Sequence, residues 1–167
     1  MNSETDAVLL DTDVFSYLLN DGDKRAAAYK RHVQNKTLAI SFITVGELYY
    51  GAVKRRWGNR RMAILDARLR SVVIVPYDID VCRAYARIKN NAKTDSGTDR
   101  VVGANDLWIA ACAVRHGLPL ISNNRKHFEG LPEVTLISEA PAVKKIEAQQ
   151  KLPLIGDASA PSPPSSR

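Results

Sequence analysis

Acidic side chains occur at three separated places in the chain where an apolar segment begins or ends. Asp11 directly follows AVLL, Glu47 lies just after LAISF, and Asp106 begins DLWIAACAVRHG. An ionised carboxylate beside buried apolar residues costs free energy unless it is paired or bound to a metal ion. Carboxylates that share a cleft repel one another, and Mg²⁺ or Mn²⁺ relieves that repulsion because these hard cations prefer oxygen ligands. The three acids are therefore candidates for one metal site.

Each acid also has a structural alternative. Asp13, close behind Asp11, is a good N-cap for the segment that follows. Glu47 and Thr44 have the spacing of a capping box, in which the Glu side chain accepts from the Thr backbone. Asp106 could cap a helix or complement its dipole. Asp11 is the hardest to explain structurally, so a functional role is favoured there first.

The elements that would hold these residues alternate along the chain. Short, nearly continuous apolar segments are typical of buried strands, and the longer amphipathic segments between them are typical of helices. The sequence predicts strands over 7–11, 38–42, 72–75, 118–122 and 134–138, and helices over 13–20, 24–33, 44–56, 59–70, 78–93 and 106–117, with Gly117 as the last C-cap. Residues 94–105 and 123–132 are predicted to be loops. This alternation favours a parallel sheet covered on both faces, with ligands bound outside the carboxyl ends of its strands.

Composition limits the class of protein. The 167 residues, 45% of them hydrophobic, suit one globular domain, expected over 7–140 between a polar lead-in (1–6) and a Pro/Ser/Ala-rich tail (141–167) that is expected to be disordered. The net charge of +6 favours an anionic partner such as nucleic acid, although a basic surface also serves solubility. Cys82 and Cys112 lack the spacing of a zinc site or a disulfide framework. Without a secretory leader or a membrane-length apolar segment, the protein is expected to be cytoplasmic.

Three segments together resemble a known family. LLDTDVFSYLL, ISFITVGELYYGA and GANDLWIAACAVRHGLPLISNNRKHF occur in the order and approximate spacing of the PIN domain, and they are similar to the VapC-like ribonuclease toxins of type II toxin–antitoxin pairs. The resemblance, over about residues 7–138, implies a PIN-like three-layer α/β/α fold with a parallel sheet of four to five strands. It also implies a Mg²⁺- or Mn²⁺-dependent endoribonuclease that cleaves RNA with metal-activated water. A homodimer and a cognate antitoxin protein are the implied partners.

The resemblance also assigns roles to single residues. Asp11, Glu47 and Asp106 match the first, second and third acids of the family motif, so they are expected to be both catalytic groups and metal ligands. The family often has a fourth acid where this sequence has Asn124. An Asn amide oxygen can still coordinate Mg²⁺ or orient water, but it contributes no charge.

Three neighbours of these positions are further candidates. Asp13 stands where the family commonly has Asn, and it could replace part of the missing charge or remain a cap. Thr12 and Asn123 could orient the metal-binding side chains without binding the metal themselves.

The segment KRRWGNRRM concentrates positive charge around an indole. Its candidate RNA-binding residues are Arg55, Arg56, Trp57, Arg60 and Arg61, since Arg contacts phosphates and bases stack on aromatic rings. A solvated helix face is the equal alternative.

Aromatic residues of the early helices are candidates for the two protein interfaces, namely Phe15, Tyr17, Tyr49 and Tyr50. Ordinary core packing is the favoured explanation for any single one of them.

Two other functions remain open. DTD after an apolar strand also resembles the opening motif of haloacid dehalogenase-like phosphotransferases, with Asp11 as nucleophile and Ser122 as the strand-end hydroxyl. That alternative leaves Glu47 and Asp106 unexplained, and residues 134–167 lack its later motifs. A non-catalytic RNA-binding PIN-like domain is the other alternative, because the fourth acid is replaced by Asn124.

Overall fold

A computed structural model describes residues 6–20, 22–92 and 101–141, and strands within these ranges form one parallel sheet. The five strands lie in the order β3-β2-β1-β4-β5. Their bounds are β1 (Ala7–Leu10), β2 (Thr37–Ser41), β3 (Val73–Val75), β4 (Leu120–Ile121) and β5 (Leu136–Ile137). Every pairing between neighbours is parallel. The predicted three-layer α/β/α architecture is confirmed.

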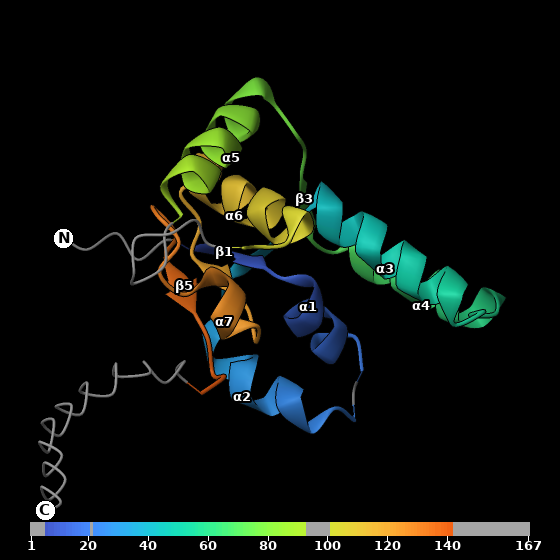
Figure 1. Ribbon diagram of the computed structural model, residues 1–167. Coiled ribbons are helices and arrows are strands. Elements are labelled where there is room, and N and C mark those ends of the chain that lie inside the picture. Colours follow the sequence, from blue (N-terminus) through green and yellow to red (C-terminus); the bar gives the residue numbers. More distant parts are fainter. Residues whose placement is uncertain (1–5, 21, 93–100, 142–167) are drawn as a thin grey trace, which may run out of the picture.

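Helices cover both faces of this sheet (Figure 1). They are α1 (Thr12–Leu18), α2 (Lys24–Val33), α3 (Phe42–Lys54), α4 (Asn59–Arg70), α5 (Ile79–Asn91), α6 (Ala104–His116) and α7 (Arg125–Phe128). One core cluster joins the sheet to α5, α6 and Phe128 of α7, and a second joins it to α1, α2, α3 and α4. Helices α3 and α4 lie side by side and project from the sheet as an extended pair, called here the α3–α4 arm (42–70).

The near-continuous apolar strands follow from this double coverage. Successive side chains of a strand point to opposite faces, so a strand buried on both faces needs apolar residues at every position. In β1, Leu9 packs in the α5–α6 cluster, whereas Val8 and Leu10 pack in the other cluster. All three are almost fully buried.

The topology fixes where a site can form. Strand β1 pairs with β2 on one side and with β4 on the other, although β4 comes much later in the chain. The strand order therefore reverses at β1, and ligands of open α/β sheets bind at the carboxyl ends of strands beside such a reversal. Asp11 follows β1 and Ser122 follows β4, so both lie at this position.

Several predicted boundaries were wrong. Helix α1 begins at Thr12 instead of Asp13, α3 begins at Phe42 instead of Thr44, and α6 begins at Ala104 instead of Asp106. The predicted loop 123–132 contains the short helix α7, whose Phe128 is fully buried. Each helix starts one or two residues closer to the preceding segment than its apolar pattern suggested.

Other expectations fall partly outside the described residues. The lead-in and tail lie there except for Asp6 and Pro141, as do residues 93–100 between α5 and α6. The two cysteines are unbridged. No helix among the described residues is long and apolar enough to cross a membrane.

Gly117 provides a test of the local structure after α6. It is the C-cap with a left-handed φ of 62°, as predicted, and a side chain there is strained. Gly117→Ala should lower the free energy of unfolding by about 1 kcal/mol in urea denaturation. Gly46→Ala is the control: Gly46 lies inside α3 with open space around a Cβ, so Ala should stabilise by about 0.5–1 kcal/mol. Equal effects of the two substitutions would contradict this account.

Candidate functional site

Asp11 is buried at the carboxyl end of the central strand. Its side chain is 5% exposed, and its backbone N–H donates to the Ile121 carbonyl of β4 at 2.9 Å. Oδ2 accepts from the Ser122 hydroxyl at 2.7 Å, and Oδ1 accepts from the Thr12 N–H at 2.8 Å. Burial raises the pKa of Asp11 to about 7, with a further contribution from the nearby charge of Asp13, against these two hydrogen bonds. The ionised form of Asp11 therefore needs stabilisation beyond these two hydrogen bonds.

Glu47 reaches the same region from α3. Its Oε2 accepts from the Thr12 hydroxyl, and its Oε1 accepts from the Asn105 amide at 2.7 Å. The capping-box alternative is wrong, because α3 is capped by Ser41, whose hydroxyl accepts from the Thr44 N–H at 3.1 Å. Glu47 instead connects Thr12, the residue next to Asp11, with Asn105, the residue next to Asp106.

Asp106 lies in the first turn of α6, which begins after Gly103. The alternative that Asp106 caps this helix is wrong, since Gly103 occupies the N-cap position, although Asp106 does lie in the first turn. A Cβ on Gly103 would lie 3.1 Å from Asp106 Oδ2, so a glycine there leaves room for the carboxylate. Asp106 contributes to the raised pKa of Asp11, which places the two charges in one electrostatic environment.

His127 is a site residue that the sequence analysis missed. Its Nδ1 lies 2.6 Å from Asp106 Oδ2, and the Asn124 side-chain amide lies 2.7 Å from the same nitrogen. An ionised carboxylate only accepts, so Nδ1–H is the donor in the contact with Asp106. The signal was its position in NNRKHF, inside a segment that carries the family resemblance.

Asp13 and Asn123 form a neighbouring pair. The prediction that Asp13 caps α1 is wrong, since Asp11 holds that position. Asp13 instead accepts from the Val14 N–H at 2.5 Å and from the Asn123 N–H at 3.1 Å, across to the β4 end. Burial is the largest cause that raises the pKa of Asp13. The Asn123 side chain accepts from the Tyr29 hydroxyl at 2.9 Å, which fixes the loop that carries Asn124.

Asn124 belongs to the same network through its backbone. Its N–H donates to the Ser122 hydroxyl at 2.9 Å, and that hydroxyl donates to Asp11. The candidate acids, Thr12, Asn123 and Asn124 thus lie around the carboxyl ends of β1 and β4.

The chemistry of this donor set suits a hard cation, although the side chains now face protein partners. Asp11, Glu47 and Asp106 present carboxylate oxygens, which Mg²⁺ and Mn²⁺ prefer. Each is engaged with a protein donor, and among the described residues no three His, Cys, Asp or Glu side chains converge on one point. Joint coordination therefore requires these carboxylates to exchange some of their present partners.

The basic segment lies apart from this network, at the far end of the α3–α4 arm (Figure 1). The candidate arginines Arg55, Arg56, Arg60 and Arg61 are exposed. Trp57 is only partly exposed, because it packs against the core cluster beneath α3 and α4. Arg61 lies over its ring at 5.9 Å. The arm tip therefore presents positive charge on the surface, whereas the indole of Trp57 packs partly against the core.

The aromatic interface candidates divide into two pairs. Phe15 and Tyr17 are buried in the core, as the packing alternative predicted. Tyr49 and Tyr50 are exposed on α3.

Comparison with known proteins gives one consistent result. Residues 8–133 match the PIN domain family. The chain is 34% identical to Ribonuclease VapC2 of Haemophilus influenzae over 122 residues, which cover 72% of this chain and 89% of that protein. It is 35% identical to VapC ribonuclease Y4jK of Sinorhizobium fredii over 130 residues, covering 73% and 90%.

Solved structures agree with the sequence matches. The fold is similar to a chain of VapBC2 from Rickettsia felis bound to a DNA fragment from its promoter, with a TM-score of 0.67, 26% identity and coverage of 79% of this chain and 98% of that one. It is also similar to VapBC-1 from nontypeable Haemophilus influenzae, with a TM-score of 0.62, 30% identity and coverage of 79% and 97%.

The raised pKa of Asp11 predicts a pH-dependent stability in metal-free buffer. The folded protein holds the Asp11 proton more tightly than the unfolded chain, so this stabilisation is present below the ordinary pKa of 3.8 and is lost as the pH rises through about 7. In EDTA, the free energy of unfolding should fall between pH 5 and pH 8. Asp11→Asn should be more stable than wild type at pH 8, by on the order of 2–4 kcal/mol. Its free energy of unfolding should fall much less than that of wild type between pH 5 and pH 8.

The control for this measurement is Asp80→Asn, which removes a partly exposed carboxylate on α5. It should retain the wild-type pH dependence. Wild-type stability that is constant or rises between pH 5 and pH 8 would contradict the assignment.

Proposed function

Because this chain belongs to the PIN domain family, we propose that it is a metal-dependent endoribonuclease and the toxin of a toxin–antitoxin pair. The observation that carries the proposal is the buried Asp11, whose pKa is raised to about 7 by burial and by its acidic neighbours. Such a group is costly to a fold unless its charge is used. The similar VapC proteins are named ribonucleases, which supports RNA as the substrate.

Mg²⁺ or Mn²⁺ is the proposed cofactor, held by Asp11, Asp106 and Glu47. When bound, the cation supplies positive charge that lowers the pKa of water and stabilises the phosphoryl oxygens during attack. Oxygen-only donors in a site with excess negative charge favour a hard divalent cation over Zn²⁺, which prefers nitrogen and sulfur ligands.

The chain's own residues have separable roles in this proposal. Ser122 and the Thr12 N–H hold the Asp11 carboxylate in one orientation through its two oxygens. Thr12 and Asn105 hold Glu47 from both sides, so Glu47 can orient the attacking water and accept its proton at an Oε atom. His127 holds Asp106. With water as the nucleophile, the products carry 5′-phosphate and 3′-hydroxyl ends.

The proposed partners follow from the same family membership. Solved structures similar to this chain include VapBC assemblies and a toxin–antitoxin complex, which supports a cognate antitoxin as a partner. A homodimer is proposed as well. Action on cellular RNA places the proposed activity in the cytoplasm. The phosphotransferase alternative is not favoured, since the PIN match spans Glu47 and Asp106 and that alternative has no use for them.

The first test replaces single acids. Asp11→Asn and Asp106→Asn should remain folded, should lower RNA cleavage by about 100-fold or more, and should abolish growth inhibition, because each removes a carboxylate that would hold the cation beside the reacting phosphate. Cleavage is measured on RNA with Mn²⁺, and growth by induced expression. Mn²⁺ should also raise the Tm of wild type more than that of either variant.

Asp80→Asn serves again as the control and should cleave normally. A fully active Asp11→Asn protein would eliminate the metal mechanism. Wild type that binds RNA with Mn²⁺ present but never cuts it would instead favour the non-catalytic alternative.

The second test addresses the basic arm tip. Replacing Arg55, Arg56, Arg60 and Arg61 together by Ala should weaken RNA binding at low salt. The slope of log affinity against log salt should flatten by up to about 3, because each lost phosphate contact removes about 0.7.

A matched variant removes four positive charges elsewhere, at Lys24 and Lys30 of α2 and Arg83 and Arg87 of α5. Its salt slope should change much less. If both variants bind RNA as wild type does, or if both lose the same affinity, the arm tip is not an RNA-binding surface.

A further inference from the structure

A hollow beside Glu47 has no role in the proposed chemistry. It has a volume of about 390 Å³ and is lined by Phe42, Ile43, Gly46, Glu47, Tyr50 and Asn105. This volume lies within the range of small-molecule sites, which are mostly apolar with a few polar groups that fix orientation. The hollow has that composition, because one side is aromatic and aliphatic and the other is the Glu47–Asn105 pair.

The aromatic residues of the hollow differ in packing and exposure. Phe42 is partly buried against the α5–α6 core cluster and makes an edge contact with Tyr77, with 6.0 Å between ring centroids. It forms a fixed wall at the base of α3. Tyr50, two turns further along the same helix, is 66% exposed. Its ring is therefore available for stacking, whereas Phe42 is already packed.

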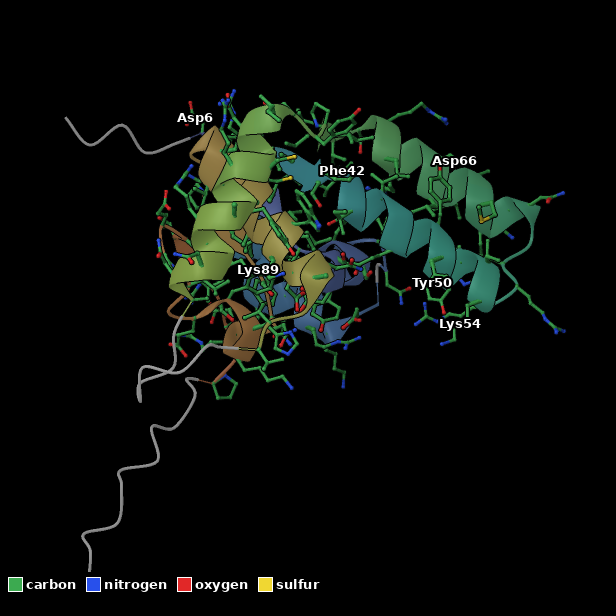
Figure 2. The ribbon with its side chains drawn as sticks, turned by 45° about the horizontal axis from the view of Figure 1, so that its top comes forward. Asp6, Phe42, Tyr50, Lys54, Asp66 and Lys89 are labelled. Atoms are coloured by element: carbon green, nitrogen blue, oxygen red, sulfur yellow. The ribbon has the colours of Figure 1, made fainter. Side chains whose placement is uncertain are left out.

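Polar groups lie at both ends of the hollow. At the inner end, the Asn105 amide donates to Glu47 Oε1 at 2.7 Å, and Glu47 in turn contacts Thr12, the residue next to Asp11. At the outer end, Lys54 Nζ lies 5.8 Å from the centre of the Tyr50 ring, and both residues project from the same part of the α3–α4 arm (Figure 2). A ligand in the hollow would thus have the acidic site on one side and a cation on the other.

The geometry points to a subsite for one unpaired nucleobase of the RNA, stacked on Tyr50, in the nucleotide next to the scissile phosphate. This inference rests on the proposed ribonuclease function. Three features favour a base: the hollow is continuous with a catalytic carboxylate, its exposed ring offers a stacking face, and Lys54 can pair with the next phosphate. Single-stranded RNA is recognised in this way, by stacking on aromatic rings together with polar contacts to base edges. The Asn105 amide is such a polar group, since a side-chain amide both donates and accepts.

Gly46 permits a test that fills the hollow without removing any contact. It lies inside α3, lines the hollow, and has no atom within 4 Å of a Cβ built on it. Gly46→Leu should therefore keep the fold, because Leu is also the better helix former, while occupying the space of the base. Ala63→Leu adds a similar apolar side chain at an exposed position of α4 outside the hollow and is the matched control.

The experiment combines these variants with altered substrates. The cleavage site of wild type is first mapped on a single-stranded RNA, and substrates are then made with one abasic nucleotide at each position around that site. For wild type with Mn²⁺, kcat/KM should fall roughly 10- to 100-fold when one base adjacent to the cut is missing, the usual range for loss of one base–aromatic stack. Gly46→Leu and Tyr50→Ala should cleave the intact RNA more slowly by a similar factor and should no longer distinguish it from that abasic substrate. Ala63→Leu should behave as wild type, and Tyr50→Phe, which keeps the aromatic ring, should still distinguish the intact RNA from the abasic substrate.

The possible failures are distinguishable. If wild type cleaves RNA but Gly46→Leu cleaves it equally well, or remains equally sensitive to the abasic nucleotide, the subsite is overturned and the proposed function stands. If Gly46→Leu leaves cleavage unchanged and weakens only binding of a cognate antitoxin, the hollow docks protein and the inference is wrong. If wild type cleaves no RNA, the proposed function fails and the subsite fails with it.

Discussion

The burial of one carboxylate at the end of the central strand is the constraint on which the site depends. Asp11 follows the strand that lies between β2 and β4 and is 5% exposed, so water solvates its charge poorly and burial raises its pKa to about 7. The pairing of β1 with β4 places Ser122 beside it, and the start of α1 places the Thr12 N–H on its other oxygen. These two donors orient the carboxylate, but they offset only part of the free energy lost when the ionised group is removed from water. The fold thus maintains a group whose ionised form is stabilised fully only by an added positive charge.

The sequence was a good guide where the signal is local and a poor one where it depends on contacts between distant residues. The sheet could be predicted because both faces of each strand are buried, which gives apolar residues at consecutive positions such as 8–10. Asp11, Glu47 and Asp106 could be named as candidates because the family motif has acids at these positions. The cap of α3 could not, because β2 and α3 have no loop between them and the fully buried Ser41 ends one and caps the other. His127 could not be assigned from periodicity either, since α7 has only four residues and the partner of His127 lies on α6.

The α3–α4 arm carries two different kinds of surface at different distances from the acids. At its tip the arginines are exposed, and Trp57 packs partly into the core, so this part supplies long-range attraction more readily than stacking. At its base Phe42, Gly46 and Tyr50 surround a hollow that adjoins Glu47. The exposed aromatic side chains therefore lie closer along α3 to the acids than the basic tip does. The exposed charge at the tip would attract a nucleic acid, and the hollow beside Glu47 would fix the position of that nucleic acid along the arm. These are separable energetic contributions.

The Asn at position 124, where the family resemblance led us to expect an acid, is consistent with the same electrostatic constraint. A further carboxylate beside Ser122 would add negative charge near Asp11 and Asp13, and both already have raised pKa values because they are buried close to other acids. In this chain the corner is formed by the Asn124 amide and the His127 imidazole, whose Nδ1–H donates to Asp106, whereas a carboxylate would only accept. The His127 donor also restrains Asp106, a task that a fourth carboxylate could not perform without a cation between the two. The chain thus carries less negative charge at this corner, and a protein donor holds Asp106 in one orientation.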